Sequence, residues 1–258
     1  MATKNGWTRN QLLIAFNLYC QMPFGKMDSR NPEVIKYAEI IGRTPSALAM
    51  KLVNIASLDP AITSTGRSGL KRASNSDKAM WAEMQADWDY FANEMQQAIN
   101  SFEIPELSMS EDDAAIPDKT IDYSGSNKVI QSTTRIGQNF FRRSVLSAYE
   151  HRCCMSGLMV SQLLVASHIV PWRVDVANRL NPSNGLCLSM LHDKAFDIGV
   201  LTIAENMTIK VSKKIANNDD MFFNAAILAY DGKPIFLPKK FRPFADFLHY
   251  HREQIFEK

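Results

Sequence analysis

Side chains that could do chemistry together lie between residues 168 and 197: His168, Asn184 in an Asn-Gly turn, and the carboxylates Asp193 and Asp197. On a helix, carboxylates four residues apart project from one face with Cβ atoms about 5–6 Å apart. Such a pair repels unless a cation lies between the two groups, and its hard oxygen ligands suit Mg²⁺ or Mn²⁺. A nearby histidine can serve as a general base because its ordinary pKa lies close to neutral pH. A divalent ion and a histidine base together suit the hydrolysis of a phosphodiester bond.

A strand, a loop, a second strand and a short helix are expected to position these residues. The run MVSQLLVASHI predicts a strand ending near His168, GLCLSML predicts a strand after Asn184, and a helix follows from His192. A hairpin over GVLTIAENMTIKVS and a closing helix over FADFLHYHREQIF complete an α+β half. The amphipathic helix RIGQNFFRRSVLSAYEHRC precedes them, and its inward-facing residues are Phe140, Val145, Leu146 and Tyr149.

The first hundred residues predict helices. Thr8 and Thr44 are suitable N-caps, Pro32 suits a first helical turn, and Gly42 suits a helix stop. One long further helix is expected over SDKAMWAEMQADWDYFANEMQQAINSF. The break at Gly42 resembles a helix-turn-helix, whose second helix can enter a DNA major groove. The cations that would then face DNA are Arg43, Lys51 and, in the turn GRSGLKR, Arg67 and Arg72. The alternative is a helical bundle with solvated basic residues.

Length and composition favour two globular domains joined by a linker. The chain has 258 residues, 46% hydrophobic and 22% charged, which is typical of a soluble globular protein. Residues 105–127 lack periodicity and are rich in Ser, Asp, Gly and Pro, which indicates a linker. It separates a helical domain, 1–104, from a second domain, 128–258, that is long enough to fold independently.

Charge and cysteine content bear on partners and compartment. The net charge of +2 means that a nucleic-acid surface must come from local clusters of Lys and Arg. The four cysteines form neither a disulfide framework nor a CxxC pair, so Cys153 and Cys154 are expected to be buried thiols in a reducing cytoplasm. No signal peptide is expected, and no apolar run approaches the roughly 20 residues that span a bilayer.

The second half resembles the HNH endonucleases, the ββα-metal nuclease module of bacterial restriction-type enzymes. The matching stretches, in the order typical of that family, are RIGQNFFRRSVLSAYEHRCCMSG, LLVASHIVPW, NPSNGLCLSMLHDKAFDIGVLTI and FLHYHREQIF. The resemblance implies that His168 is the general base and that Asn184 braces the loop and orients it. The family places a metal ligand nine residues after that asparagine, which is Asp193, with His192 one residue short. Sequence alone leaves both open.

The metal shell departs from the family pattern. The residue before the base often binds the metal in the family, but here it is Ser167, a poor ligand. Asp197 on the same helix would compensate for it. The cysteine pairs that bind zinc in some relatives are also missing from the sequence.

The sequence therefore predicts a bacterial or phage endonuclease that hydrolyses double-stranded DNA with one Mg²⁺ or Mn²⁺ ion, of restriction or defence type. The recognised sequence, the need for a modified base and a homodimer stay open. The alternatives are a DNA-binding regulator with a decayed nuclease module and a toxin-like nuclease without sequence choice. Sequence-independent contacts to the DNA backbone are expected from Arg135, Arg142, Arg143 and Lys194.

Overall fold

The chain folds into a helix-rich structure with two small antiparallel sheets in its second half. A computed structural model describes residues 6–64, 73–102, 128–216 and 219–257, with the side chains of 128–136 left out. The first half contains, in chain order, α1 (Arg9–Gln21), η1 (Phe24–Lys26), α2 (Pro32–Ile40), α3 (Pro45–Ala56), α4 (Pro60–Thr63), α5 (Asn75–Ala86) and α6 (Trp88–Ser101). The second half contains α7 (Lys128–Ala148), η3 (Ser161–Leu163), β1 (Leu164–His168), η4 (Pro182–Asn184), β2 (Gly185–Ser189), α8 (Met190–Asp197), β3 (Leu201–Ile203), β4 (Ile209–Val211), α9 (Lys213–Ala216), α10 (Met221–Ala226), η5 (Leu228–Tyr230) and α11 (Ala245–Gln254).

Local signals in the sequence set the ends of the first three helices. Thr8 forms a capping box at α1, and the Thr44 side chain accepts from the backbone of Ala47 at the start of α3. Pro32 is at the first position of α2, and Gly42 has a φ of +65°, which a glycine adopts without steric cost. These predicted boundaries are confirmed.

The single long helix predicted for residues 76–102 is wrong. Asp87 is extended, with φ −152° and ψ 94°, and its side chain accepts from the backbone of Tyr90 as the N-cap of α6. The break turns Trp88 into the core, where its ring lies 6.5 Å from Phe140 and 5.6 Å from Phe241. The sequence around Asp87, MQADWDYF, contains no Gly or Pro, so no strong helix breaker marks this position.

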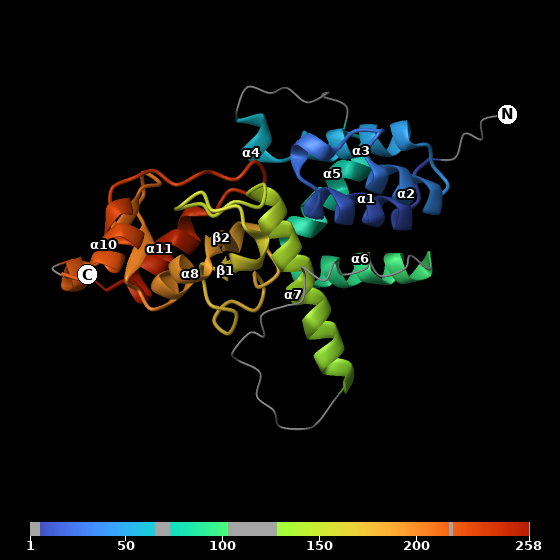
Figure 1. Ribbon diagram of the computed structural model, residues 1–258. Helices are drawn as coiled ribbons and strands as arrows, with labels where there is room; N and C mark the ends of the chain where they lie inside the picture. The colour runs from blue at the N-terminus through green and yellow to red at the C-terminus, as the bar shows by residue number, and fades with distance from the viewer. Residues whose placement is uncertain (1–5, 65–72, 103–127, 217–218, 258) are drawn as a thin grey trace.

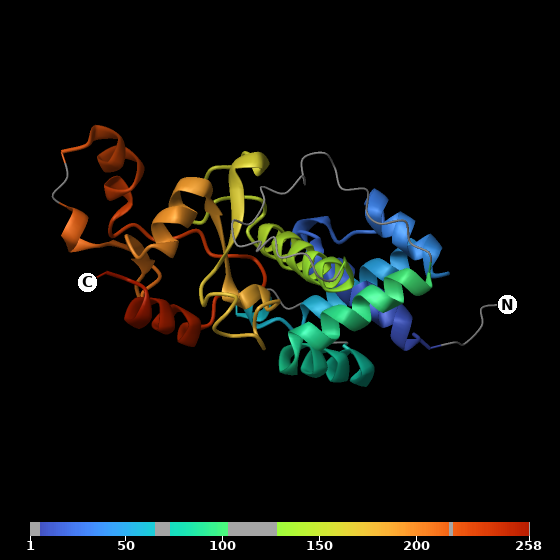
Figure 2. The same cartoon turned by 90° about the horizontal axis from the view of Figure 1, so that it is seen from below.

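The two halves share one hydrophobic core, with α7 lying between the helices of the first half and the sheets of the second (Figure 1; Figure 2). Helix α1 packs against both α6 and α7. The rings of Tyr19 and Phe241, from opposite halves, meet edge-on at 5.6 Å. The predicted linker, 105–127, lies outside the described residues, so its two boundaries with the domains stay a prediction. Because the core is shared, residues 128–258 would lose part of their packing if they were separated from the first half.

Buried polar contacts also join the halves. The ammonium group of Lys240, fully buried, donates to the carbonyls of Tyr19, Cys20 and Met22 at 2.5, 3.0 and 2.8 Å. These carbonyls lie at the C-terminal end of α1, which otherwise leaves such acceptors unsatisfied. Burial lowers the pKa of Lys240 to about 7. Asp59 adds a second link, accepting from the backbone of Phe241 at 3.1 Å.

Two of the cations predicted to face DNA are engaged within the first half. Lys51, predicted to face DNA, is buried and pairs with the buried Asp77 at 2.8 Å, so its ammonium group is engaged inside the first half. It is also the sole cation of α3, whose outward face therefore carries no positive charge. Arg43 donates to the carbonyl of Gly6 at 2.6 Å and to Gln11 at 2.9 Å. Both cations serve to hold helices together. Arg67 and Arg72 lie outside the described residues.

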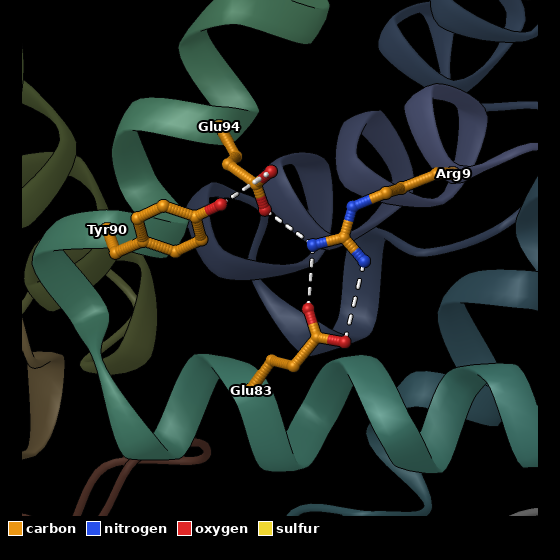
Figure 3. A network of polar contacts seen from close by, with 4 residues as sticks. All are labelled: Arg9, Glu83, Tyr90 and Glu94. Carbon is orange, nitrogen blue, oxygen red and sulfur yellow. Dashed lines mark hydrogen bonds and ion pairs between the residues drawn. The ribbon is translucent and has the colours of Figure 1, made fainter.

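A charge network on the surface joins α1, α5 and α6 (Figure 3). The guanidinium of Arg9 contacts Glu83 of α5 at 2.7 Å and Glu94 of α6 at 2.5 Å, and the Tyr90 hydroxyl donates to Glu94 at 3.2 Å. Because the side chains of Arg9 and Glu83 are each 45% exposed, solvent screens this network.

The second half follows the predicted order of strands and helices. Strands β1 and β2 are antiparallel, with His168 opposite Gly185, and β3 and β4 form the predicted hairpin. The first strand is shorter than predicted, because residues 161–163 form the turn η3, and α8 begins at Met190 rather than His192. Helix α8 packs against β1, β2 and β3. Within the described residues, none of the helices has the length and apolar character needed to cross a membrane.

Candidate active site

His168 ends β1 and lies between an aromatic ring and a loop. Its imidazole stacks on Phe141 of α7 at a centroid distance of 3.9 Å and an interplanar angle of 8°. Its Nε2 lies 2.9 Å from the carbonyl oxygen of Arg179. A carbonyl only accepts, so Nε2 is the donor, and in the neutral ring the lone pair is then on Nδ1. The imidazole is held in one orientation and one tautomer.

Asn184 is fully buried and ties the two ends of the loop together. Its Oδ1 accepts from the backbone of Val170 at 2.8 Å, and its Nδ2 donates to the Val170 carbonyl at 3.2 Å. The same Nδ2 lies 3.4 Å from the carbonyl of Asn178. The amide thus continues the pairing of the strands beyond the end of β1. This geometry fits the bracing role that the family resemblance implies.

Gly185, opposite His168, lets α7 approach the sheet closely. A Cβ at this position would lie 2.4 Å from Val145 Cγ2 and 2.9 Å from Phe141 Cζ, distances that real Cβ atoms essentially never show. The absence of a side chain therefore allows Phe141 to reach the ring of His168. Sequence reasoning identified Gly185 only as part of a turn.

The two faces of α8 separate the candidate metal ligands. Asp193 is half-buried and Asp197 exposed, one helical turn apart, whereas His192 lies on the buried face with 3% of its surface exposed. The Nδ1 of His192 lies 2.7 Å from Ser189 Oγ, and its ring meets Tyr230 edge-on at 5.2 Å. His192, predicted as an alternative ligand, is therefore turned into the interior by these contacts.

A buried thiol completes the surroundings of His192. Cys153 Sγ lies 3.8 Å from His192 Nδ1 and accepts from the backbone of Ser156 at 3.5 Å. Burial raises the pKa of Cys153, but the hydrogen bonds from His192 and Ser156 outweigh it and bring the value to about 6. All four cysteines are free and buried, as predicted for Cys153 and Cys154.

His251 of α11 fixes α8 from the other side. Its ring stacks on Phe196 of α8 at 3.6 Å, its Nε2 donates to the Phe196 carbonyl at 3.1 Å, and its Nδ1 lies 2.8 Å from Thr202 Oγ1. Burial lowers the pKa of His251 to about 4. Nothing in the spacing of the sequence connects α11 with the position of α8. An amphipathic pattern places a histidine on an inner face without indicating its partner.

The cations predicted to contact the DNA backbone differ in their environment. Lys194 is exposed, and Arg143 is half-buried. Arg142 is half-buried and donates to the carbonyl of Leu164 at 2.9 Å, which fastens α7 to β1. The side chain of Arg135 lies outside the described residues.

Within the described part of the chain, no cluster of three or more His, Cys, Asp or Glu side chains could hold a metal ion. Asp193 and Asp197 therefore offer at most a partial set of protein ligands. Ser167, at the position where the family often has a further ligand, is 3% exposed, and its Oγ lacks a hydrogen-bond partner among the described residues.

Comparison with known proteins shows which families and structures this part of the chain resembles. A family model described as HNH endonuclease matches residues 153–204, which include His168, Asn184 and α8. Among solved structures, the chain is similar to a modification-dependent TagI restriction endonuclease, with 22% identity and a TM-score of 0.34. That match covers 45% of this chain and 37% of the other. No curated protein matches the chain. The chain therefore resembles HNH endonucleases over residues 153–204, the stretch that contains β1, the loop, β2 and α8.

Proposed function

We propose that this chain is a metal-dependent DNA endonuclease of restriction type in which His168 is the general base. The observation that carries the proposal is the setting of the imidazole: it stacks on Phe141 and donates from Nε2 to the carbonyl of Arg179. A base must be held in one tautomer and one orientation to take a proton from water, and these contacts supply both.

In the proposed reaction, Nδ1 of His168 takes a proton from the water that attacks phosphorus. The P–O bond to the leaving sugar oxygen breaks as the new one forms, and solvent water protonates that oxygen. In the resulting imidazolium, the Nε2–H group still donates its hydrogen bond to the carbonyl of Arg179. Asn184 keeps the loop in place because its amide bonds both the backbone N–H and the carbonyl of Val170. This arrangement needs no movement of the ring between the free and protonated states.

Asp193 and Asp197 are the proposed ligands of a single Mg²⁺ or Mn²⁺ ion. Their placement one turn apart on the side of α8 away from the buried face fits a site with few protein ligands, in which water and phosphate oxygens complete the shell. Ser167 Oγ, buried without a partner among the described residues, is a further oxygen near the base in sequence. When bound, the ion would stabilise the charge that develops on the phosphate and the leaving oxygen.

The first half is proposed to recognise double-stranded DNA. Lys51 and Arg43 are engaged internally, so the positive charge for this role must come from other residues, with Arg67 and Arg72 as the remaining predicted candidates. The outward face of α3 would then make polar or apolar contacts rather than ionic ones. A requirement for a modified base is an open part of the proposal.

A plasmid-nicking assay tests the proposal, with unmodified, methylated and hydroxymethylated DNA in parallel. His168→Ala should slow cleavage by about 10²–10⁴-fold, the usual cost of losing a general base. His249→Ala is the matched control, since His249 is an exposed histidine of α11. Asp193→Ala should need more Mn²⁺ than the wild type because a lost ligand lowers metal affinity first.

Two results would contradict the proposal. A His168→Ala variant that keeps more than a tenth of the wild-type rate would remove the base assignment. Cleavage that persists in a chelator would remove the metal. Cleavage without any preference among the DNA substrates would instead favour the toxin-like alternative.

A further inference from the structure

The carbonyl that holds His168 belongs to a residue whose side chain is held by the other half of the chain. Arg179 lies in the loop between β1 and β2. Its Nε lies 3.1 Å from Oδ1 of Asp89, and its Nη2 lies 2.6 Å from Oδ2. Asp89 is in the first turn of α6. A paired guanidinium–carboxylate contact fixes orientation as well as distance.

A second contact leads from the same guanidinium to the base. Arg179 Cζ lies 5.2 Å from the ring centroid of Trp172, and that ring meets His168 edge-on at 5.3 Å and 88°. A cation over an indole face is attracted to it. Asp89 therefore reaches His168 by two routes, one through the main chain of residue 179 and one through the Trp172 side chain.

We propose that Asp89 is a positioning residue for the general base, and that the helical half sets the geometry of the nuclease half through the Asp89–Arg179 ion pair. The inference rests on the proposed role of His168. The acting group at position 179 is its main-chain carbonyl, and the ion pair determines where that carbonyl lies. Misplacing a catalytic group by about 1 Å can cost about 10²-fold in rate.

The Asp89–Arg179 ion pair is partly exposed to solvent, so the fold should tolerate its loss. The side chains of Arg179 and Asp89 are 30% and 29% exposed, and such pairs contribute little to stability. Asn184 and the strand pairing still hold the loop when the pair is broken. We therefore expect a partial effect on the rate, about 3- to 10-fold, and not its abolition.

Exchanging the charges of Asp89 and Arg179 distinguishes a positioning role of the ion pair from a general loss of folded structure. The variants are Asp89→Asn, Asp89→Arg, Arg179→Asp and the double variant Asp89→Arg/Arg179→Asp. Every variant keeps the carbonyl of residue 179, so only its position changes. Single-turnover nicking of plasmid at saturating enzyme should slow about 3- to 10-fold in the single variants, while the enzyme concentration for half-maximal rate stays within about twofold. The double variant should be clearly faster than either single charge reversal but slower than the wild type, because it restores the ion pair and not the cation–π contact with Trp172.

Glu83→Ala is the matched control, because it removes an ion pair, Arg9–Glu83, that lies within the helical half (Figure 3). It should leave the nicking rate unchanged. A wild-type rate in Asp89→Asn, or a double variant as slow as the single ones, would overturn the positioning role. If those results came with an inactive His168→Ala, the base assignment would stand and this inference alone would fail. An active His168→Ala would remove the proposed function itself.

Discussion

Replacing Gly185 with alanine tests how closely α7 must approach the site. The added Cβ would lie 2.4 Å from Val145 Cγ2, 2.9 Å from Phe141 Cζ and 3.2 Å from the carbonyl oxygen of Pro182. Val145 and Phe141 are 0% and 2% exposed, so neither can move into solvent. Overpacking of this kind costs about 1–3 kcal/mol, and alanine recovers about 0.5 kcal/mol by restricting the unfolded chain. We expect a net loss of about 1–2 kcal/mol and a Tm lower by about 2–8 °C.

The same substitution should slow cleavage, because Phe141 would be pushed against the imidazole of His168, which it already contacts at 3.9 Å. Thermal unfolding and plasmid nicking measure the two effects. Val145→Ala in the same chain should relieve the clash, so that the double variant is more stable than the sum of the single losses predicts. Gly25→Ala is the control, since a Cβ there meets nothing within 4 Å. Equal melting temperatures for Gly185→Ala and Gly25→Ala would refute the close approach.

Three further predictions concern stability. Asp77→Ala should cost about 3–5 kcal/mol in urea unfolding because it leaves the Lys51 ammonium buried without its partner, and a small loss would reject that pairing. Burial lowers the pKa of His251 to about 4, so between pH 6.5 and 4 this histidine is protonated in the unfolded chain and not in the folded one. The free energy of unfolding should therefore fall by on the order of 3 kcal/mol as the pH drops through this window. His251→Gln should flatten that slope and the exposed His249→Gln should not; equal slopes in both variants would contradict the assignment. Residues 128–258 expressed alone should melt below the full chain because Phe140, Lys240 and Phe241 lose their packing against the first half, and equal melting would show that the shared core adds nothing.

The sequence determined those features that depend on neighbours along the chain. Thr8, Pro32 and Thr44 mark helix starts because capping and the fixed φ of proline act within one turn. The order of His168 and Asn184 indicated the resemblance to HNH endonucleases, which the family match over 153–204 confirms. These signals are local, so they can be read without knowing how the chain packs.

Only the tertiary structure decided which charged and polar groups face inward. Lys51 finds Asp77 26 residues away, and Arg179 finds Asp89 90 residues away. His192 and Asp193 are adjacent in sequence, yet Ser189 and Tyr230 hold one inside while the other lies nearer the surface. A charged side chain is stable in the interior only with a partner, and here that partner comes from a distant element. Spacing along one element cannot reveal such a partner, because it is supplied by the packing of the two halves around α7.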